Sequence, residues 1–128
     1  MNQKLTKQER LYRKKEIGFL FEEGKSSFSY PYKIKWHETD IPQNGIPAQI
    51  LISVSKRSFK KAVSRNKIKR LIKEAYRTQK HQLWEALKGR ENQIHIAIIY
   101  IDKVENDFAF HQKAIGKLLR KMIEELNK

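Results

Sequence analysis

Residues 56–77 have the sequence KRSFKKAVSRNKIKRLIKEAYR, with ten Lys or Arg side chains and a single acid, Glu74. At about 100° per residue, the apolar and basic positions of this stretch fall on opposite sides of a helix. The apolar side contains Ile68, Leu71, Ile72 and Ala75. The basic side contains Arg65, Asn66, Lys69, Arg70, Lys73 and Arg77. The pattern predicts an amphipathic helix that packs on a core and presents cations to a polyanion, as nucleic-acid-binding helices do.

Two other interpretations of this basic helix are a solvated surface and a membrane-surface helix. A merely solvated surface would pair most of its cations with acids at i,i+4, and one acid cannot do so. A membrane-surface helix would keep its apolar side for lipid. Here neighbouring apolar segments compete for that side. We therefore favour a nucleic-acid partner, with RNA and DNA both open at this point.

The overall composition fits a single intracellular domain over residues 1–128. The chain is 39% hydrophobic, carries a formal net charge of +14 and contains no cysteine. A charge of this size weakens the compact state by self-repulsion and is usual in proteins with polyanionic partners. No apolar run is long enough to span a bilayer, and the N-terminus lacks the apolar core of a signal peptide. We expect a cytoplasmic protein with no disulfide, no thiolate metal site and no membrane partner.

The hydrophobic periodicity alternates between helix and strand along the chain. A first helix should end near Glu23, before Gly24, and could start near Lys7 or Lys14. Residues 28–37 and 48–55 predict two strands, and 93–101 predict a third. Asp107 should cap a last helix. The basic helix should reach about Thr78, a shorter helix should follow over 82–87, and the last helix should bury Phe110, Ala114, Ile115, Leu118, Leu119, Met122 and Ile123.

These elements predict an α+β fold with one mixed sheet. The basic helix lies between two strands, so it should form a β-α-β crossover. General rules make such a crossover right-handed.

The sequence offers no recognisable active site. The four histidines include no two at metal-ligand spacing on one element. His95 lies in an apolar strand, where a structural imidazole is the better interpretation. No phosphate loop, nucleophile motif or zinc pattern is present. We therefore expect neither catalytic residues nor a metal site made by the protein alone.

The aromatic residues of the first strand permit two interpretations. Tyr32 and Trp36 alternate with Lys33 and Lys35. Aromatic side chains among cations can stack on unpaired bases. They could equally pack beneath the first helix, and the pattern alone leaves both possibilities open.

The segment Ser64–Arg77 resembles the signature helix of the protein subunit of bacterial ribonuclease P. Arg65, Asn66, Lys69, Arg70, Glu74, Tyr76 and Arg77 match that motif, while Lys67 and Lys73 replace arginines. The preceding ISVSKR and the N-terminal Arg10, Leu11, Ile17, Phe21 and Gly24 are also similar to the family pattern. Three departures are a missing Gly before the helix, one extra residue in SFKKAV, and Ile17 where Phe is common. The resemblance extends over nearly the whole chain.

The resemblance implies a single domain in α-β-β-β-α-β-α order, with about four strands and a left-handed crossover. It also implies an accessory enzyme subunit, because the RNA subunit, with magnesium ions, performs the hydrolysis that frees the 5′ end of tRNA. The implied partners are ribonuclease P RNA and precursor tRNA, with one monomeric protein per RNA and no cofactor bound tightly to the protein.

The resemblance also assigns two groups of binding residues. The RNA subunit should contact Lys56, Arg57, Lys60, Lys61, Arg65, Asn66, Lys67, Lys69, Arg70, Lys73 and Arg77. The 5′ leader of precursor tRNA should contact Ile17, Phe21, Tyr32, Ile34 and Trp36.

The main alternative is a ribosomal-type structural RNA-binding protein without a role in tRNA processing. A helix-turn-helix DNA-binding protein is a weaker alternative, because a strand and not a partner helix precedes the basic helix.

Overall fold

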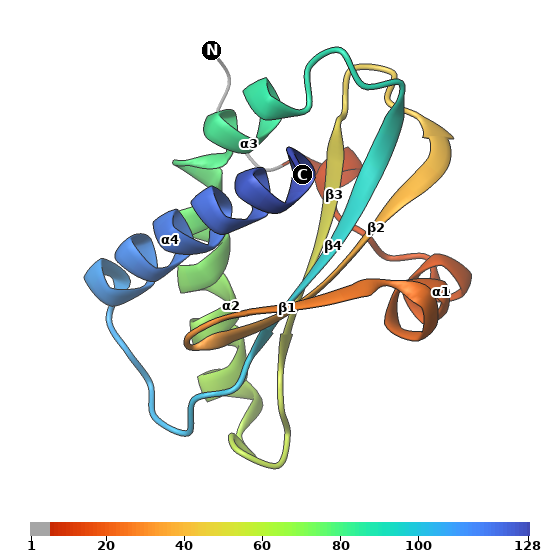
Figure 1. Cartoon of the computed structure of the whole chain (residues 1–128). Helices are drawn as coiled ribbons and strands as arrows, with labels where there is room; N and C mark the ends of the chain where they lie inside the picture. The colour runs from red at the N-terminus through yellow and green to blue at the C-terminus, as the bar shows by residue number, and fades with distance from the viewer. Residues whose placement is uncertain (1–5) are drawn as a thin grey trace.

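A mixed sheet separates two unequal sets of helices in the computed structural model, which describes residues 6–128 (Figure 1). The larger set, α2, α3 and α4, covers one face of the sheet, and α1 lies on the opposite side. In chain order the elements are η1 (Lys7–Glu9), α1 (Lys14–Glu23), β1 (Lys25–Ser29), β2 (Tyr32–Pro42), β3 (Ala48–Val54), α2 (Ala62–Arg77), α3 (Lys80–Ala86), β4 (Asn92–Tyr100) and α4 (Phe108–Leu126).

The four strands follow the order β1-β2-β4-β3 across the sheet. β1 pairs with β2, and β2 with β4, in antiparallel fashion, whereas β3 and β4 are parallel. The helices α2 and α3 connect the parallel pair, as a parallel connection requires. These features confirm the predicted mixed sheet and element order. The left hand implied for the crossover remains a prediction.

The segment 28–37 forms parts of two strands, so the prediction of one strand there is wrong. The chain reverses direction at Tyr30–Pro31, and Ser29 pairs with Tyr32 at the end of the hairpin. Proline has no backbone N–H and a fixed φ, so it suits a turn better than the interior of a ladder.

The first α-helix begins at Lys14, the later of the two predicted starts, and ends at Glu23 as predicted. Lys7–Glu9 instead forms a separate 3-10 turn. The Glu9 carboxylate accepts hydrogen bonds from the Thr6 backbone N–H at 2.7 Å and the Thr6 hydroxyl at 2.8 Å. This local capping pattern stabilises a turn without extending it into α1.

The main core lies between the sheet and helices α2, α3 and α4. The alternate residues of β2 from Tyr32 to Trp36 face this core, as do the apolar residues of α4. Asp107 caps α4 as predicted, because its carboxylate accepts the Phe110 N–H at 2.9 Å. A smaller apolar cluster of Leu11, Leu20 and Ala97 attaches α1 to the other side of the sheet.

None of the helices in residues 6–128 combines the length and apolar content needed to cross a lipid bilayer.

Candidate RNA interface

Helix α2 has the predicted division into a buried and an outward side. Ile68, Ile72, Ala75 and Tyr76 are buried, while Leu71 is half-buried. On the outward side Asn66, Lys67 and Arg70 are exposed, and Arg65, Lys69, Lys73 and Arg77 are half-buried. The helix is therefore fixed by its apolar side, and its cations extend from a rigid support.

Three cations of α2 have protein partners that the sequence did not reveal. Arg77 forms a two-pronged contact with the Glu74 carboxylate through Nε at 3.0 Å and through Nη2. The contact lowers the pKa of Glu74. Lys67 Nζ lies 3.5 Å from Glu105 Oε1. Arg65 Nη1 donates to the backbone carbonyls of Phe59 at 2.8 Å and Lys60 at 2.9 Å, leaving its other N–H groups available.

Lys69, Arg70 and Lys73 differ from these three. Within residues 6–128 no carboxylate lies at ion-pair distance from any of them. Lys73 lies one helical turn from both Lys69 and Arg70 on the outward side of α2, so its charge repels theirs when no anion is present. They are the strongest candidates for contacts with phosphates.

The segment between β3 and α2 extends this cationic surface. Phe59 attaches this segment to the core. Its side chain is buried, and its ring stacks on the ring of Tyr100 with the centroids 6.2 Å apart. The Phe59 N–H donates to the Ser55 carbonyl at 3.1 Å. Around this anchor the cations are exposed, namely Lys56, Arg57, Lys60 and Lys61. We call this segment, residues 55–61, the basic loop.

The structure contradicts the predicted role of three leader residues. Tyr32 and Ile34 are 0% exposed and Trp36 is 6% exposed, because α4 packs over them. The Tyr32 hydroxyl lies 2.6 Å from His111 Nδ1, and Trp36 Nε1 donates to Glu125 at 3.2 Å. Stacking of these side chains on RNA is therefore the wrong prediction. Packing beneath the first helix is also wrong for them, since they lie beneath the last one.

Part of the opposite face of the sheet is accessible and carries Lys33 and Lys35, which alternate with these residues along β2. We call it the open sheet face and define it by five residues joined across the strands. Lys33 pairs with Phe28 on one side and Ile99 on the other, and Ile99 pairs with Ser53. Lys35 follows at the next position of the same face. The residues are Phe28, Lys33, Lys35, Ser53 and Ile99.

Helix α1 packs over one end of this face. Leu20 is buried against Ala97, and Ile17 packs on the same cluster, while Phe21 is 38% exposed. Ile17 and Phe21 therefore lie on the element that borders the open sheet face, unlike the three buried residues of β2. Phe28, at 48% exposure, is an aromatic residue on this face that the sequence interpretation missed. Its alternation with Ser27 and Ser29 was the available signal.

The described residues contain no group of three or more His, Cys, Asp or Glu side chains arranged to hold a metal ion. Burial lowers the pKa of both His95 and His111, so their imidazoles favour the neutral state. His111 lies among Tyr32, Tyr100 and Phe110 in the core. Both histidines occupy structural positions, as predicted for His95.

Comparison with known proteins identifies the family. A family model described as Ribonuclease P matches residues 5–123. The chain belongs to this family. The ribonuclease P protein component of Porphyromonas gingivalis (strain ATCC 33277) is 36% identical over 115 residues, covering 90% of this chain and 83% of the relative. That of Chlorobium phaeobacteroides is 38% identical over 104 residues, covering 76% and 71%.

Solved ribonuclease P proteins share the fold. The structure from Thermotoga maritima has a TM-score of 0.69 at 23% identity, covering 88% of this chain and 96% of that chain. The structure from Staphylococcus aureus has a TM-score of 0.68 at 21% identity, covering 89% and 94%. The mixed sheet with its crossover helices is thus the architecture of ribonuclease P proteins.

Proposed function

We propose that the chain is the RNA-binding subunit of ribonuclease P and that α2, with the basic loop, binds the catalytic RNA. The observation that carries this proposal is the row of Lys69, Arg70 and Lys73, which have no carboxylate partner in residues 6–128. Such a row is electrostatically unfavourable by itself and becomes favourable when phosphates approach it. The basic loop adds four exposed cations at the N-terminal end of the helix.

The open sheet face is the proposed binding surface for the 5′ leader of precursor tRNA. Lys33 and Lys35 would bind leader phosphates, and Phe28 and Phe21 would stack on unpaired bases. Ile17 supports the helix that borders this surface by packing on the cluster around Ala97. The face combines two lysines and a serine with Phe28 and Ile99, and its edge at β3 leads to the basic loop.

The proposed contribution of the protein is binding, and the hydrolysis is proposed to belong to the RNA subunit. Magnesium supplies the hydrolytic chemistry when it is bound in the holoenzyme. The described residues do not fit a protein-made magnesium site, since they offer no suitable cluster of ligands. RNA phosphates would hold the ions. We further propose one monomeric protein per RNA, acting in the cytoplasm.

Leader binding would affect substrate choice through linkage of binding free energies. Contacts between the leader and the open sheet face exist only before cleavage. They would raise the affinity for precursor tRNA above that for mature tRNA, which assists product release.

A reconstitution experiment distinguishes this function from that of a ribosomal-type RNA-binding protein. The purified chain should restore cleavage of precursor tRNA by a bacterial ribonuclease P RNA at low magnesium. A variant with Lys69→Glu and Arg70→Glu should fail, and Lys117→Glu on the exposed side of α4 should succeed. Tight RNA binding without restored cleavage would favour the ribosomal-type alternative.

A further inference from the structure

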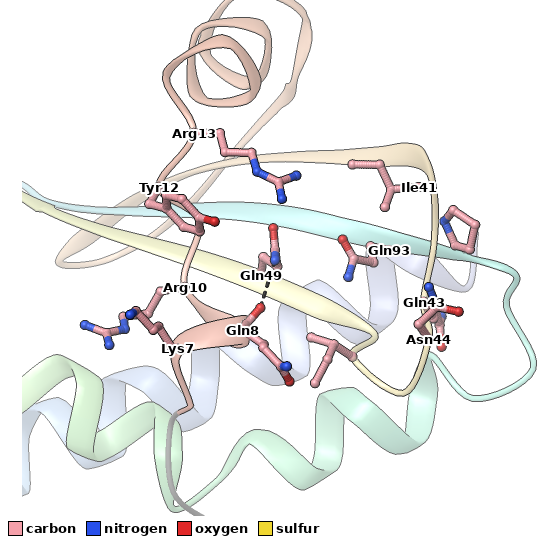
Figure 2. Close-up of a pocket in the computed structure, with 12 residues that line it drawn as sticks. Lys7, Gln8, Arg10, Tyr12, Arg13, Ile41, Gln43, Asn44, Gln49 and Gln93 are labelled. Atoms are coloured by element: carbon pink, nitrogen blue, oxygen red, sulfur yellow. Dashed lines mark hydrogen bonds between the residues drawn. The ribbon is translucent and has the colours of Figure 1, made fainter.

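A second surface at the other end of the sheet has the features of a nucleotide site. Figure 2 shows a cavity between the segment 7–13 and the turn that joins β2 to β3. Its volume is about 750 Å³, within the range of small-ligand sites. We call it the N-terminal cavity. Its lining contains none of the five residues of the open sheet face and consists of Lys7, Gln8, Arg10, Tyr12, Arg13, Ile41, Pro42, Gln43, Asn44, Ile46, Gln49 and Gln93.

The lining combines cations with carboxamides and has no carboxylate. Lys7, Arg10 and Arg13 are its cations, and five of the other residues are Asn or Gln. Cations without acids favour an anionic ligand. Carboxamides supply a donor and an acceptor together, which matches the edges of nucleobases.

An aromatic side chain adds a stacking surface. Tyr12 is 65% exposed, and the Arg13 guanidinium lies 5.7 Å from the centroid of its ring. Arg13 Nη1 also lies 3.4 Å from Glu16 Oε1. This ion pair is exposed, so it restrains the Arg13 side chain only weakly. In Figure 2 the Tyr12 hydroxyl, the Arg13 guanidinium and the Gln49 amide lie around one space. An unpaired base could stack there beside a bound phosphate.

The environment of the Gln93 side chain points to a ligand independently of the cations and of Tyr12. Its side chain lines the cavity although the residue is only 7% exposed. Its carboxamide makes no hydrogen bond with another residue of 6–128. By contrast, Gln43 Nε2 donates to the carbonyls of Leu87 and Asn92 at 3.2 Å, and Gln49 Nε2 donates to that of Gln8 at 2.8 Å. Most of the Gln93 side chain is thus held in place by burial, while its carboxamide, without a protein partner in residues 6–128, is free to bind a ligand in the cavity.

We propose that the N-terminal cavity binds one or two unpaired nucleotides of RNA. Tyr12 stacks on a base, Gln93 binds its edge, and Lys7, Arg10 and Arg13 bind the adjoining phosphates. This inference extends the proposed RNA-binding function to a surface separate from α2 and the open sheet face. The RNA could be the leader of the precursor or an unpaired segment of the RNA subunit, since both present the same chemistry.

A single-stranded probe tests binding directly on the full chain. Titration with hexauridylate should shift the side-chain amide signals of Gln93 in an NMR spectrum. Tyr12→Ala should weaken hexauridylate binding about 5- to 100-fold, the range for one lost stacking contact. Arg10→Ala should make the slope of log K against log salt shallower by about 0.7.

Matched controls lie on the exposed side of α4. Gln112→Leu and Lys113→Ala should leave hexauridylate affinity unchanged, whereas Gln93→Leu should lower it. Tyr12 is exposed, so its replacement remains informative even if Gln93→Leu disturbs folding. Unchanged Gln93 signals together with unchanged affinity of Tyr12→Ala would overturn the proposal, since the cavity would then hold only water.

Affinity measurements on the reconstituted complex identify which RNA occupies the cavity. If Tyr12→Ala lowers affinity for precursor tRNA with a long leader and not for leaderless tRNA, the leader occupies the cavity. If Tyr12→Ala lowers the affinity for the RNA subunit measured without tRNA, an unpaired segment of the RNA subunit occupies the cavity. If neither affinity changes, the inference is wrong, while restored cleavage by the unmodified chain would still support the proposed function.

Discussion

Glu9 and Lys80 form a buried ion pair between the N-terminal segment and α3. Lys80 Nζ lies 2.6 Å from Glu9 Oε1, and the two side chains are 8% and 2% exposed. The Lys80 ammonium also lies 4.7 Å from the centroid of the Trp84 ring. Glu9 is followed by Arg10, which bridges to Ile50 of β3. The pair therefore fixes residues 7–13, and this segment leads into α1 and forms one wall of the N-terminal cavity.

Breaking this pair should destabilise the fold. Glu9→Ala removes the carboxylate that pairs with the buried Lys80 ammonium and caps the Thr6 turn, so the free energy of unfolding should fall by about 3–5 kcal/mol. Denaturant unfolding measures the loss. The exposed pair of Lys88 and Glu85, 3.6 Å apart, supplies the control, because Glu85→Ala should change stability by about 1 kcal/mol or less. Equal effects of the two substitutions would contradict the structural role of Glu9.

The outward cations of α2 should contribute to RNA affinity in a salt-dependent way. Arg70→Ala removes one proposed phosphate contact, so the slope of log K against log salt should become shallower by about 0.7–0.9. The measurement is a set of dissociation constants for the RNA subunit at several salt concentrations. Lys117→Ala, on the exposed side of α4, should leave the slope unchanged. An unaltered slope for Arg70→Ala would remove Arg70 from the interface.

Asn66 should be a functional residue and not a helix cap. Helix α2 begins at Ala62 with Lys61 as its N-cap, so Asn66 lies within the helix and is exposed. Asn is a poorer helix former than Ala, so Asn66→Ala should raise the free energy of unfolding by about 0.5 kcal/mol. RNA-subunit affinity should fall at the same time. Unchanged affinity in the more stable variant would show that Asn66 makes no RNA contact.

The two faces of β2 should respond differently to substitution. Lys33→Ala and Lys35→Ala should weaken holoenzyme binding of leader-bearing precursor tRNA and leave folding stability nearly unchanged. Tyr32→Ala should instead lower stability by about 3–5 kcal/mol, as expected for a large core aromatic side chain. Paired dissociation constants for precursor and mature tRNA, with a thermal unfolding curve for each variant, separate the effects. Equal losses for both tRNAs would exclude leader binding at Lys33 and Lys35.

The buried histidines should make the fold sensitive to acid. Burial lowers the pKa of His111 and of His95 below the usual value of 6.5. The unfolded chain therefore binds protons first as pH falls. The stabilisation is fully present above about pH 6.5 and is lost below it, by up to about 1.4 kcal/mol per pH unit for each histidine.

Comparing unfolding at about pH 7.5 and about pH 5.5 tests this account. The difference between the two free energies should be smaller for His111→Gln than for the unmodified chain. The exposed His81→Gln should show the unmodified difference. If His111→Gln retains the full difference, His111 is not a source of the acid sensitivity.

Local sequence determined most of the elements of this protein. The apolar spacing of α2 and α4 fixed both helices and their buried sides, because a helix repeats every 3.6 residues whatever surrounds it. Asp107 acted as a cap through contacts within four residues. The motif in Ser64–Arg77 was sufficient to indicate the family. Each of these features depends on residues close together in the chain.

Only the tertiary structure decided which face of β2 is buried. A strand of alternating residues has two faces, and its sequence does not say which one a distant helix will cover. Here α4, which packs from the far end of the chain, covers Tyr32 and Trp36 and leaves Lys33 accessible. The aromatic residues on that strand therefore became core, and the lysines became the candidate site.

The ion pair of Glu9 with Lys80 and the N-terminal cavity were likewise decided by tertiary structure. Glu9 meets Lys80 across 71 positions, and the N-terminal cavity combines residues from 7–13 with Gln93 of β4. Such contacts exist only after the sheet and its crossover have formed, since they depend on how segments pack in space. Periodicity and local motifs describe neighbours along the chain, so they could predict α2 and its charge but not the partners that the folded chain brings to each side chain.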